Sequence, residues 1–177
     1  MKPARIPSRP ECLKMLKDNG VPEHIIAHSV KVTEIAMEYG KLIKKNGGTV
    51  DLKLLEAGAL LHDITKHVGL GNHETEINHC ESGAELLRKM GMPEIAEIVR
   101  CHMMTIVFKS SEMLDTWEKK LVCYADKRVN HDRRVTLDER LAYLNERYPK
   151  GRKIFKEAEP FIRNLEKEIF EKAGVRE

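Results

Sequence analysis

Six histidine and aspartate side chains interrupt otherwise apolar helical faces along this chain, and their types indicate metal chemistry. A charged imidazole or carboxylate is costly to bury alone, so a single one is usually a core residue with satisfied hydrogen bonds. Four imidazoles and two carboxylates satisfy one another best around a shared positive charge, which one or two divalent ions would supply. Nitrogen and oxygen ligands without a thiolate suit iron, manganese, zinc, cobalt or nickel, and not calcium. The six residues are His28, His62, Asp63, His79, His102 and Asp126.

The adjacent pair His62-Asp63 is the most specific local element. Neighbouring residues on a helix project about 100° apart, so both can reach one ion only at a helix end or in a distorted turn. Lys66 follows shortly after the pair, and its ammonium group can hold a phosphate as a point charge. The alternative interpretation is a helix C-terminus at which His62 and Lys66 complement the helix dipole.

Apolar residues at helical spacing predict that helices carry all six residues, so we expect an all-α fold. Pro22 and Pro93 are typical of helix starts, Asp51 is a good N-cap, and Thr136 with Glu139 has the spacing of a capping box. Strand alternation is weak and confined to residues 104–108. The expected helices cover residues 22–46, 52–63, 79–90 with Asn78 as its cap, a segment that starts at Pro93 and carries His102 and Ile106 on its inner face, 115–129, a segment that starts at Thr136, and 150–173 with Pro160 inside.

Length and composition describe a globular protein. The chain has 177 residues, of which 41% are hydrophobic and 33% charged, and its formal net charge is +3. We expect a single domain over residues 1–177 without a membrane span, because the longest strongly apolar stretch covers only residues 57–61. Four scattered cysteines favour reduced thiols that pack between helices in a cytoplasmic protein. The small net charge, and basic residues that do not interleave with aromatic ones, argue against a nucleic-acid partner. A homodimer is left open.

Four sequence segments together carry a family resemblance. The order His28, His62-Asp63, Asp126, with the segments ALLHDITKH, HCESGAELL, VRCHM and LVCYADKRV, resembles the HD domain superfamily of metal-dependent phosphohydrolases. The resemblance covers residues 20–135 or so and implies an HD-domain helical bundle on which the helices of residues 136–174 pack. The chain is similar to the small HD hydrolases that cleave symmetrical dinucleoside tetraphosphates. It lacks the GYP signature of cyclic di-GMP enzymes, and Thr65 stands where the family's HDIGK variant has glycine.

The resemblance also implies roles for individual residues. His28, His62, Asp63 and Asp126 would bind a first divalent ion, and His79 and His102 a second ion that Asp63 bridges to the first. Such ions polarise phosphoryl oxygens and lower the pKa of water toward 7, so that hydroxide can attack phosphorus. Asp63 and Lys66 would be the catalytic side chains, with Asp63 positioning the water. The expected substrate-binding residues are Lys66, Lys127 and Arg133, since ammonium and guanidinium groups bind phosphate oxygens.

The expected function is therefore metal-dependent hydrolysis of a phosphate ester or anhydride in a nucleotide or another small phosphorylated molecule. Two alternatives remain open at this point. One is a non-catalytic HD module that senses a nucleotide, which would hold metal but release no phosphate. The other is an HD-fold oxygenase with a di-iron pair, which would take up oxygen when reduced and loaded with iron.

Overall fold

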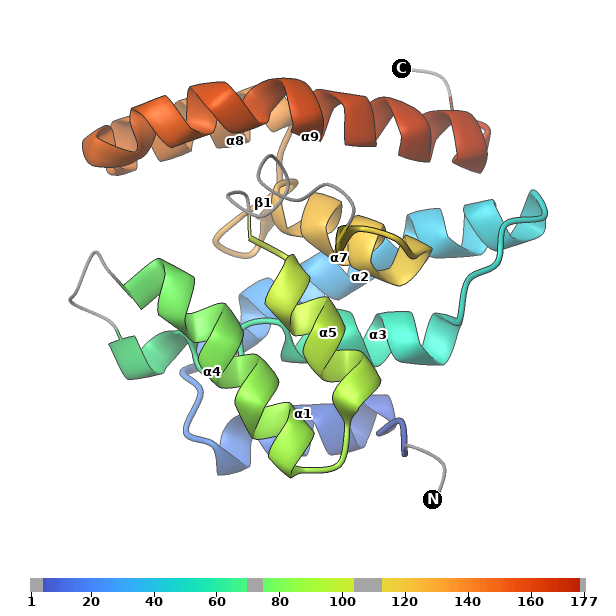
Figure 1. The fold of residues 1–177 in the computed structure, drawn as a ribbon, viewed down its shortest axis with the longest axis vertical. Coiled ribbons are helices and arrows are strands. Elements are labelled where there is room, and N and C mark those ends of the chain that lie inside the picture. The colour runs from blue at the N-terminus through green and yellow to red at the C-terminus, as the bar shows by residue number, and fades with distance from the viewer. Residues whose placement is uncertain (1–4, 70–74, 104–112, 176–177) are drawn as a thin grey trace.

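The computed structural model describes residues 5–69, 75–103 and 113–175, and it has the predicted all-α fold (Figure 1). Within these residues, the strands β1 (Val129–Asn130) and β2 (Arg133–Arg134) form one short antiparallel hairpin, which the sequence pattern did not predict. Two-residue strands are too short to show alternation. The helices are α1 (Arg9–Asp18), α2 (Glu23–Lys45), α3 (Leu52–Leu61), α4 (Thr75–Lys89), α5 (Pro93–Cys101), α7 (Trp117–Asp126), α8 (Leu137–Arg147) and α9 (Arg152–Ala173), with 3-10 turns η1 (Lys66–Gly69) and η3 (Pro149–Gly151).

Helix α2 is the central element of the bundle. It packs against α3, α7 and α9, while α4 packs against α5, and α5 in turn against α3. Figure 1 shows α9 crossing one end of the molecule and α1 lying at the opposite end. The C-terminal helices α8 and α9 pack on each other, and α9 also contacts α7.

Two clusters of buried apolar side chains stabilise this arrangement. One joins α2, α7, α8 and α9 and includes Cys101 and Ala125. The other joins α1, α3, α4 and α5 and includes Leu61 and Ile64. These four residues are sequence neighbours of the predicted metal ligands, so the polar residues lie where the two apolar clusters meet.

Several predicted helix signals are confirmed by hydrogen bonds. The Asp51 carboxylate accepts hydrogen bonds from the backbone N–H groups of Lys53 and Leu54, at 2.9 and 3.1 Å. Thr136 and Glu139 form the capping box of α8. Pro160 lies inside α9, as expected.

Other predicted boundaries were wrong, and helix α1 was missed. Its signal is a second capping box, in which Ser8 and Glu11 bond reciprocally. Helix α4 begins at Thr75, so Asn78 lies inside the helix and is not its cap. Helix α3 ends at Leu61, α5 ends before His102, and α7 covers only Trp117–Asp126. Residues 104–108, with Ile106, lie outside the described part of the chain.

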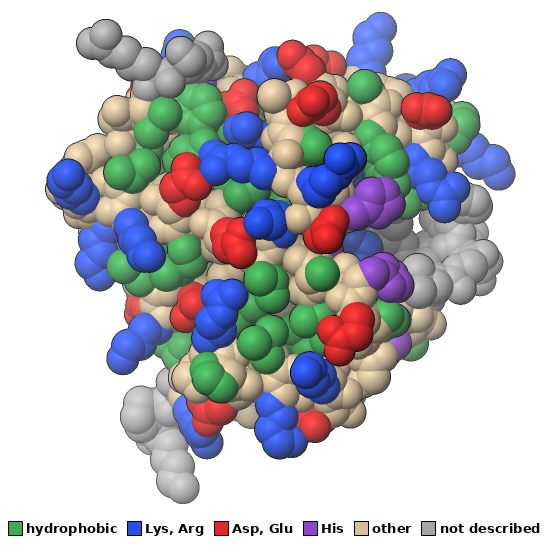
Figure 2. All heavy atoms as spheres, turned by 180° about the vertical axis from the view of Figure 1, so that it is seen from behind, with side chains coloured by type: hydrophobic (Ala, Val, Ile, Leu, Met, Phe, Trp, Pro, Cys, Tyr) green, Lys and Arg blue, Asp and Glu red, His purple; other side chains and the backbone are tan. Residues whose placement is uncertain are grey.

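Among the described residues, no helix is both long enough and apolar enough to cross a bilayer. On the face seen in Figure 2, Lys and Arg side chains are interspersed with Asp and Glu.

Candidate metal centre

The structure brings all six predicted metal-binding residues together, although they come from five different helices. Five of the six are buried, and the sixth, His79, is half-buried. His28 lies on α2, His62 and Asp63 follow the end of α3, His79 lies on α4, His102 caps the end of α5, and Asp126 ends α7. The pair His62-Asp63 occupies a turn between α3 and η1. This turn meets the requirement that two adjacent side chains can face one point only where the helix is interrupted.

Asp63 lies at the centre of the group and is fully buried. Its Oδ2 is 3.3 Å from Nε2 of His62 and 3.8 Å from Nε2 of His28. Its Oδ1 is 3.5 Å from Nε2 of His79 and 3.6 Å from Nε2 of His102. The carboxylate therefore separates two pairs of imidazoles, with one pair facing each oxygen.

Asp126 completes the first half of the centre. Its Oδ1 is 3.0 Å from Nε2 of His28 and 3.8 Å from Nε2 of His62. In the second half, the Nε2 atoms of His79 and His102 are 3.3 Å apart. The first half thus offers two imidazoles and two carboxylates, and the second offers two imidazoles that share Asp63.

Backbone carbonyl groups orient three of the four imidazoles. A carbonyl oxygen only accepts hydrogen bonds, so Nδ1 of each ring carries a hydrogen and Nε2 points to the centre, where it would offer a lone pair to a metal ion in the neutral ring. Histidines that bind metals are held in this way. The distances from Nδ1 to the carbonyl oxygen are 2.8 Å for His28 to His131, 2.8 Å for His62 to Ala59, and 2.6 Å for His102 to Val99.

The donors of this centre fit divalent ions. Nε2 of His62 and Oδ1 of Asp63 are buried without a hydrogen-bond partner, although such atoms are normally satisfied. Burial alone would raise the pKa of Asp63, but His62 and Lys66 outweigh it and hold this pKa well below its usual range. Burial, reinforced by the neighbouring His102, lowers the pKa of His79 to about 3. Ionised carboxylates and neutral imidazoles are the forms that bind metals.

Cys80 is a neighbour of the second half that the sequence pattern did not place there. Its Sγ is 3.5 Å from Nε2 of His79 and 3.6 Å from Nε2 of His102. Its only sequence signal is that it follows His79. Burial raises the pKa of the Cys80 thiol, which is therefore protonated at neutral pH.

The three predicted phosphate-binding cations occupy very different positions. Nζ of Lys66 donates to Oδ2 of Asp63 at 2.7 Å, on the open side of the centre. Lys127 is buried, and its Nζ donates to Oδ2 of Asp126 at 2.5 Å and to the carbonyl oxygen of His102 at 3.0 Å. Arg133 lies exposed on β2 and does not line the cavities beside the centre. The structure therefore brings Lys66 and Lys127 to the site but not Arg133.

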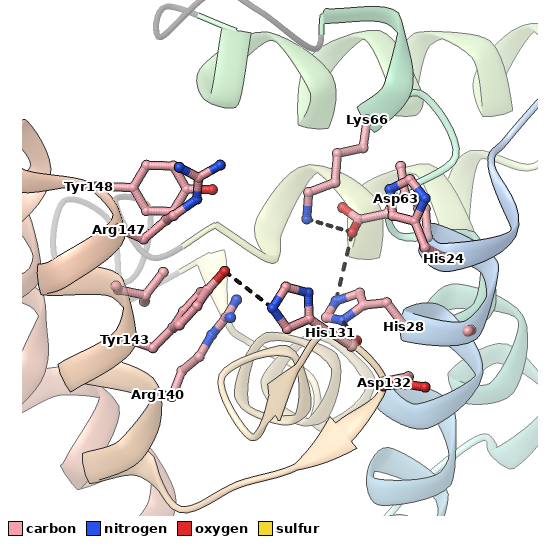
Figure 3. Close-up of a pocket in the computed structure, with 13 residues that line it drawn as sticks. His24, His28, Asp63, Lys66, His131, Asp132, Arg140, Tyr143, Arg147 and Tyr148 are labelled. Atoms are coloured by element: carbon pink, nitrogen blue, oxygen red, sulfur yellow. Dashed lines mark hydrogen bonds and ion pairs between the residues drawn. The ribbon is translucent and has the colours of Figure 1, made fainter.

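Two cavities flank the predicted metal-binding residues. The larger, of about 490 Å³, is bordered by His28, Asp63 and Lys66 on one side and by α8 on the other (Figure 3). The smaller, of about 130 Å³, is bordered by His79, His102 and Lys127. Lys66, Arg140 and Leu144 line both cavities, so the two spaces adjoin across these side chains.

The wall formed by α8 contains residues that the sequence pattern did not single out. Arg140, Tyr143, Leu144 and Arg147 line the larger cavity together with Tyr148, which follows the helix. Their spacing of three, four and seven residues places the first four on one helical face. The sequence signal that could have found them is the basic and aromatic residues that share one face of this helix.

Comparison with known proteins gives one family match. Residues 25–130 match the HD domain family. The chain is 31% identical over 153 residues to the uncharacterized protein MJ0778 of Methanocaldococcus jannaschii, covering 80% of this chain and 86% of that protein. No solved structure matches significantly.

Two further relatives are longer proteins. The chain is 32% identical over 145 residues to the tRNA (cytidine(56)-2'-O)-methyltransferase of Picrophilus torridus, covering 76% of this chain and 40% of the enzyme. It is 37% identical over 98 residues to ribonuclease Y of Fervidobacterium nodosum, covering 52% of this chain and 17% of the enzyme. The chain therefore spans less than half the length of these two relatives.

Proposed function

Because the chain belongs to the HD domain family, we propose that it is a metal-dependent phosphohydrolase acting on a nucleotide or another small phosphorylated molecule. The observation that carries this proposal is the position of Asp63. Its two oxygens each face a pair of imidazoles, and Oδ1 has no hydrogen-bond partner within the described residues. A carboxylate in this position suits two divalent ions that share it.

The proposed ligands follow the two halves of the centre. The residues are His28, His62, Asp63 and Asp126 for one ion, and His79, His102 and Asp63 for the other. Divalent ions bound there would polarise the phosphoryl oxygens and lower the pKa of water. The identity of the metal, among iron, manganese, nickel, cobalt and zinc, is left to elemental analysis.

The remaining chemistry belongs to the side chains around this centre. Asp63 stays ionised, so its oxygens can accept a hydrogen bond from the attacking water and position it. Burial alone would lower the pKa of Lys66, but Asp63 outweighs it and the pKa is raised, so the ammonium group stays charged. Lys66 would neutralise charge that develops on the phosphoryl oxygens during the reaction. The carbonyl of His131 keeps Nε2 of His28 aimed at the centre.

The test combines metal content with phosphate release. Elemental analysis of the purified protein is followed by a screen of phosphate esters and anhydrides with manganese, nickel, cobalt and iron. We expect Asp63→Ala to lose the activity, and Asp18→Ala, which changes an exposed carboxylate on α1, to retain it. Unchanged phosphate release by metal-replete Asp63→Ala would contradict the proposal.

Symmetrical dinucleoside tetraphosphates belong in this screen because of the resemblance of the metal-binding segments. The segment after Asp126, KRVNHDRRVTLDERL (residues 127–141), departs from that branch, because it is longer and more basic than the short segment that follows the last aspartate there. Diadenosine tetraphosphate is therefore compared with a nucleoside monophosphate. A clear preference for the tetraphosphate would assign the chain to that branch.

RNA is a second candidate substrate, favoured by the names of two relatives, a tRNA methyltransferase and a ribonuclease Y. Against it, the face seen in Figure 2 mixes both signs of charge and presents no continuous basic surface. A labelled single-stranded RNA tests this candidate directly. Metal binding without turnover of any substrate would instead favour the nucleotide-sensing alternative, and oxygen uptake by the reduced, iron-loaded protein would favour the oxygenase.

We propose that the C-terminal helices form one domain with the rest of the chain, because α8 borders the cavity beside Asp63. We also propose a cytoplasmic location. All four cysteines are buried and unpaired, as expected where thiols stay reduced.

A further inference from the structure

One wall of the larger cavity is built by residues beyond the matched family segment. That segment ends at residue 130, whereas helix α8 covers Leu137–Arg147. Arg140 and Tyr143 point from α8 toward Lys66, Asp63 and the histidines across the cavity (Figure 3). The α8 side chains that face this cavity lie outside the matched family segment and are therefore candidates for substrate recognition.

Arg140 is a cation without an acidic partner within the described residues. Its Nη1 donates to the neutral amide oxygen of Asn130 at 2.8 Å, and its Nε is buried without any hydrogen-bond partner. Arginine side chains are normally paired when their polar atoms are buried. Arg140 lines both cavities, so its charged side chain lies beside the space in front of the predicted metal-binding residues.

The charges around this space favour an anion. Lys66, Lys127 and Arg140 supply three positive charges, and Arg140 lies close enough to both lysines for its charge to act on them. Arg147 also lines the larger cavity and adds a fourth positive charge, against the three carboxylates of Asp63, Asp126 and Asp132. Divalent ions would add further positive charge. A guanidinium group binds two oxygens of a phosphate in a fixed fork. The expected anion is therefore a phosphoryl group placed between Arg140 and Lys66.

Beyond Arg140 the cavity becomes aromatic. Tyr143 and Tyr148 line it, although the chain has only four tyrosines. The ring of His131 lies against Tyr143 with centroids 5.6 Å apart, and the hydroxyl of Tyr143 is 3.5 Å from Nε2 of His131. Aromatic side chains beside a positively charged groove are typical of sites where bases stack. A volume of about 490 Å³ lies within the range of small-molecule sites, roughly 300–1,000 Å³.

We propose that the α8 wall recognises a nucleoside monophosphate group, with Arg140 and Lys66 binding the phosphate and Tyr143 stacking on the base. This inference rests on the proposed function in that the phosphate lies next to Asp63. It assigns substrate choice to a helix outside the matched family segment.

The first test measures phosphate binding to the manganese-loaded protein by isothermal titration calorimetry. Inorganic phosphate is the probe, and Arg140→Gln and Arg140→Lys are compared with the wild type. Loss of a hydrogen-bonded charge is expected to weaken binding about 10- to 100-fold for Arg140→Gln, and Arg140→Lys should recover part of it. Arg133→Gln is the matched control, because it removes an exposed arginine that does not line the cavity. Equal affinity of Arg140→Gln and wild type would overturn the phosphate assignment.

The second test addresses the base. The probe is the methylene-phosphonate analogue of adenosine monophosphate, which resists hydrolysis, and inorganic phosphate is the comparison. Loss of stacking should weaken analogue binding about 5- to 100-fold for Tyr143→Leu and leave metal content unchanged, while Tyr143→Phe retains analogue binding. Phosphate affinity should fall much less than analogue affinity, since only the contact of the Arg140 guanidinium with the Tyr143 ring, 5.8 Å from its centroid, is lost. Analogue binding that is unaffected by Tyr143→Leu would overturn the base assignment. Tighter binding of a short single-stranded oligonucleotide than of the analogue would overturn the assignment to a mononucleotide.

These results separate the inference from the proposed function. Phosphate release that depends on Asp63, together with phosphate binding that is insensitive to Arg140, would retain the function and refute the inference. If phosphate and analogue binding depend on Arg140 and Tyr143 but no substrate is hydrolysed, the role of α8 in recognition is supported and the proposed hydrolase activity is refuted.

Discussion

Replacing Lys127 with methionine distinguishes a substrate-binding role from a supporting one. The sequence pattern placed Lys127 among the phosphate-binding cations. In the structure it is 4% exposed, and its Nζ donates to Asp126 and to the carbonyl of His102. Methionine retains the length of the side chain and removes its charge and its donors. In the variant, the Asp126 carboxylate would stay buried without its cation.

The expected cost follows from this loss of compensation. Removing one partner of a buried ion pair destabilises a protein by about 3–5 kcal/mol. In a chain of this size 1 kcal/mol shifts Tm by about 2–4 °C, so the metal-free variant should unfold roughly 6–20 °C below the metal-free wild type. A divalent ion beside Asp126 supplies the same compensation, so the metal-loaded variant should lose much less. Circular dichroism melts with and without manganese measure both differences.

Two controls keep this prediction decisive. Lys14→Met removes an exposed i,i+4 pair with Asp18 and should change stability by less than about 0.5 kcal/mol. If Lys127→Met does not fold, the double variant with Asp126→Asn removes the unpaired charge and should recover part of the stability. The reasoning would be refuted if metal-free Lys127→Met had the same Tm as the metal-free wild type and the metal-loaded variant had a raised KM. That result would assign Lys127 to substrate binding.

Three further predictions concern the metal, the packing and a cap. Adding metal at 100 times its Kd should stabilise the chelator-treated protein by about 2.7 kcal/mol, or roughly 5–11 °C in Tm, and an unchanged Tm would contradict the metal centre. Gly58→Ala places a Cβ 2.9 Å from two carbons of Ile98, so overpacking of about 1–3 kcal/mol should exceed the gain in helix propensity of about 1 kcal/mol. In denaturant unfolding, Gly58→Ala should cost less stability when Ile98 is also replaced by alanine. If the effects of the two substitutions simply add, there is no clash between these residues. Asp51→Ala should cost about 0.5–2 kcal/mol in the same assay and Asp51→Asn much less, and equal losses would argue against the cap.

The sequence alone determined the fold class and predicted the six candidate metal-binding residues that the structure brings together. Helical periodicity is a local property, so the apolar stripes and the caps at Asp51 and Thr136 predicted most helices. Polar residues on apolar faces are also visible locally, and their number and type indicated a shared cation. Helix α1 could have been found in the same way, from the Ser8–Glu11 capping box.

Only the tertiary structure decided how these residues are grouped. His28 and Asp126 are 98 residues apart in the sequence, yet Nε2 and Oδ1 are 3.0 Å apart in space. The division of the imidazoles between the two oxygens of Asp63 depends on how the helices rotate as their apolar faces pack. Helical spacing predicts on which face of its helix a side chain lies, but not which other element packs against that face.

The positions of three basic side chains could not be predicted from the sequence either. Lys127 turns inward to Asp126, Arg133 remains exposed on the hairpin, and Arg140 reaches the cavity from α8. All three are basic residues within a short stretch of chain, and composition does not distinguish them. The turn between the two strands also contributes a long-range contact. His131 lies in this turn at a φ of 55°, and its carbonyl oxygen accepts the hydrogen bond from Nδ1 of His28. Such long-range contacts arise when the whole chain is packed, because burial and pairing select among side-chain directions that the local sequence leaves equivalent.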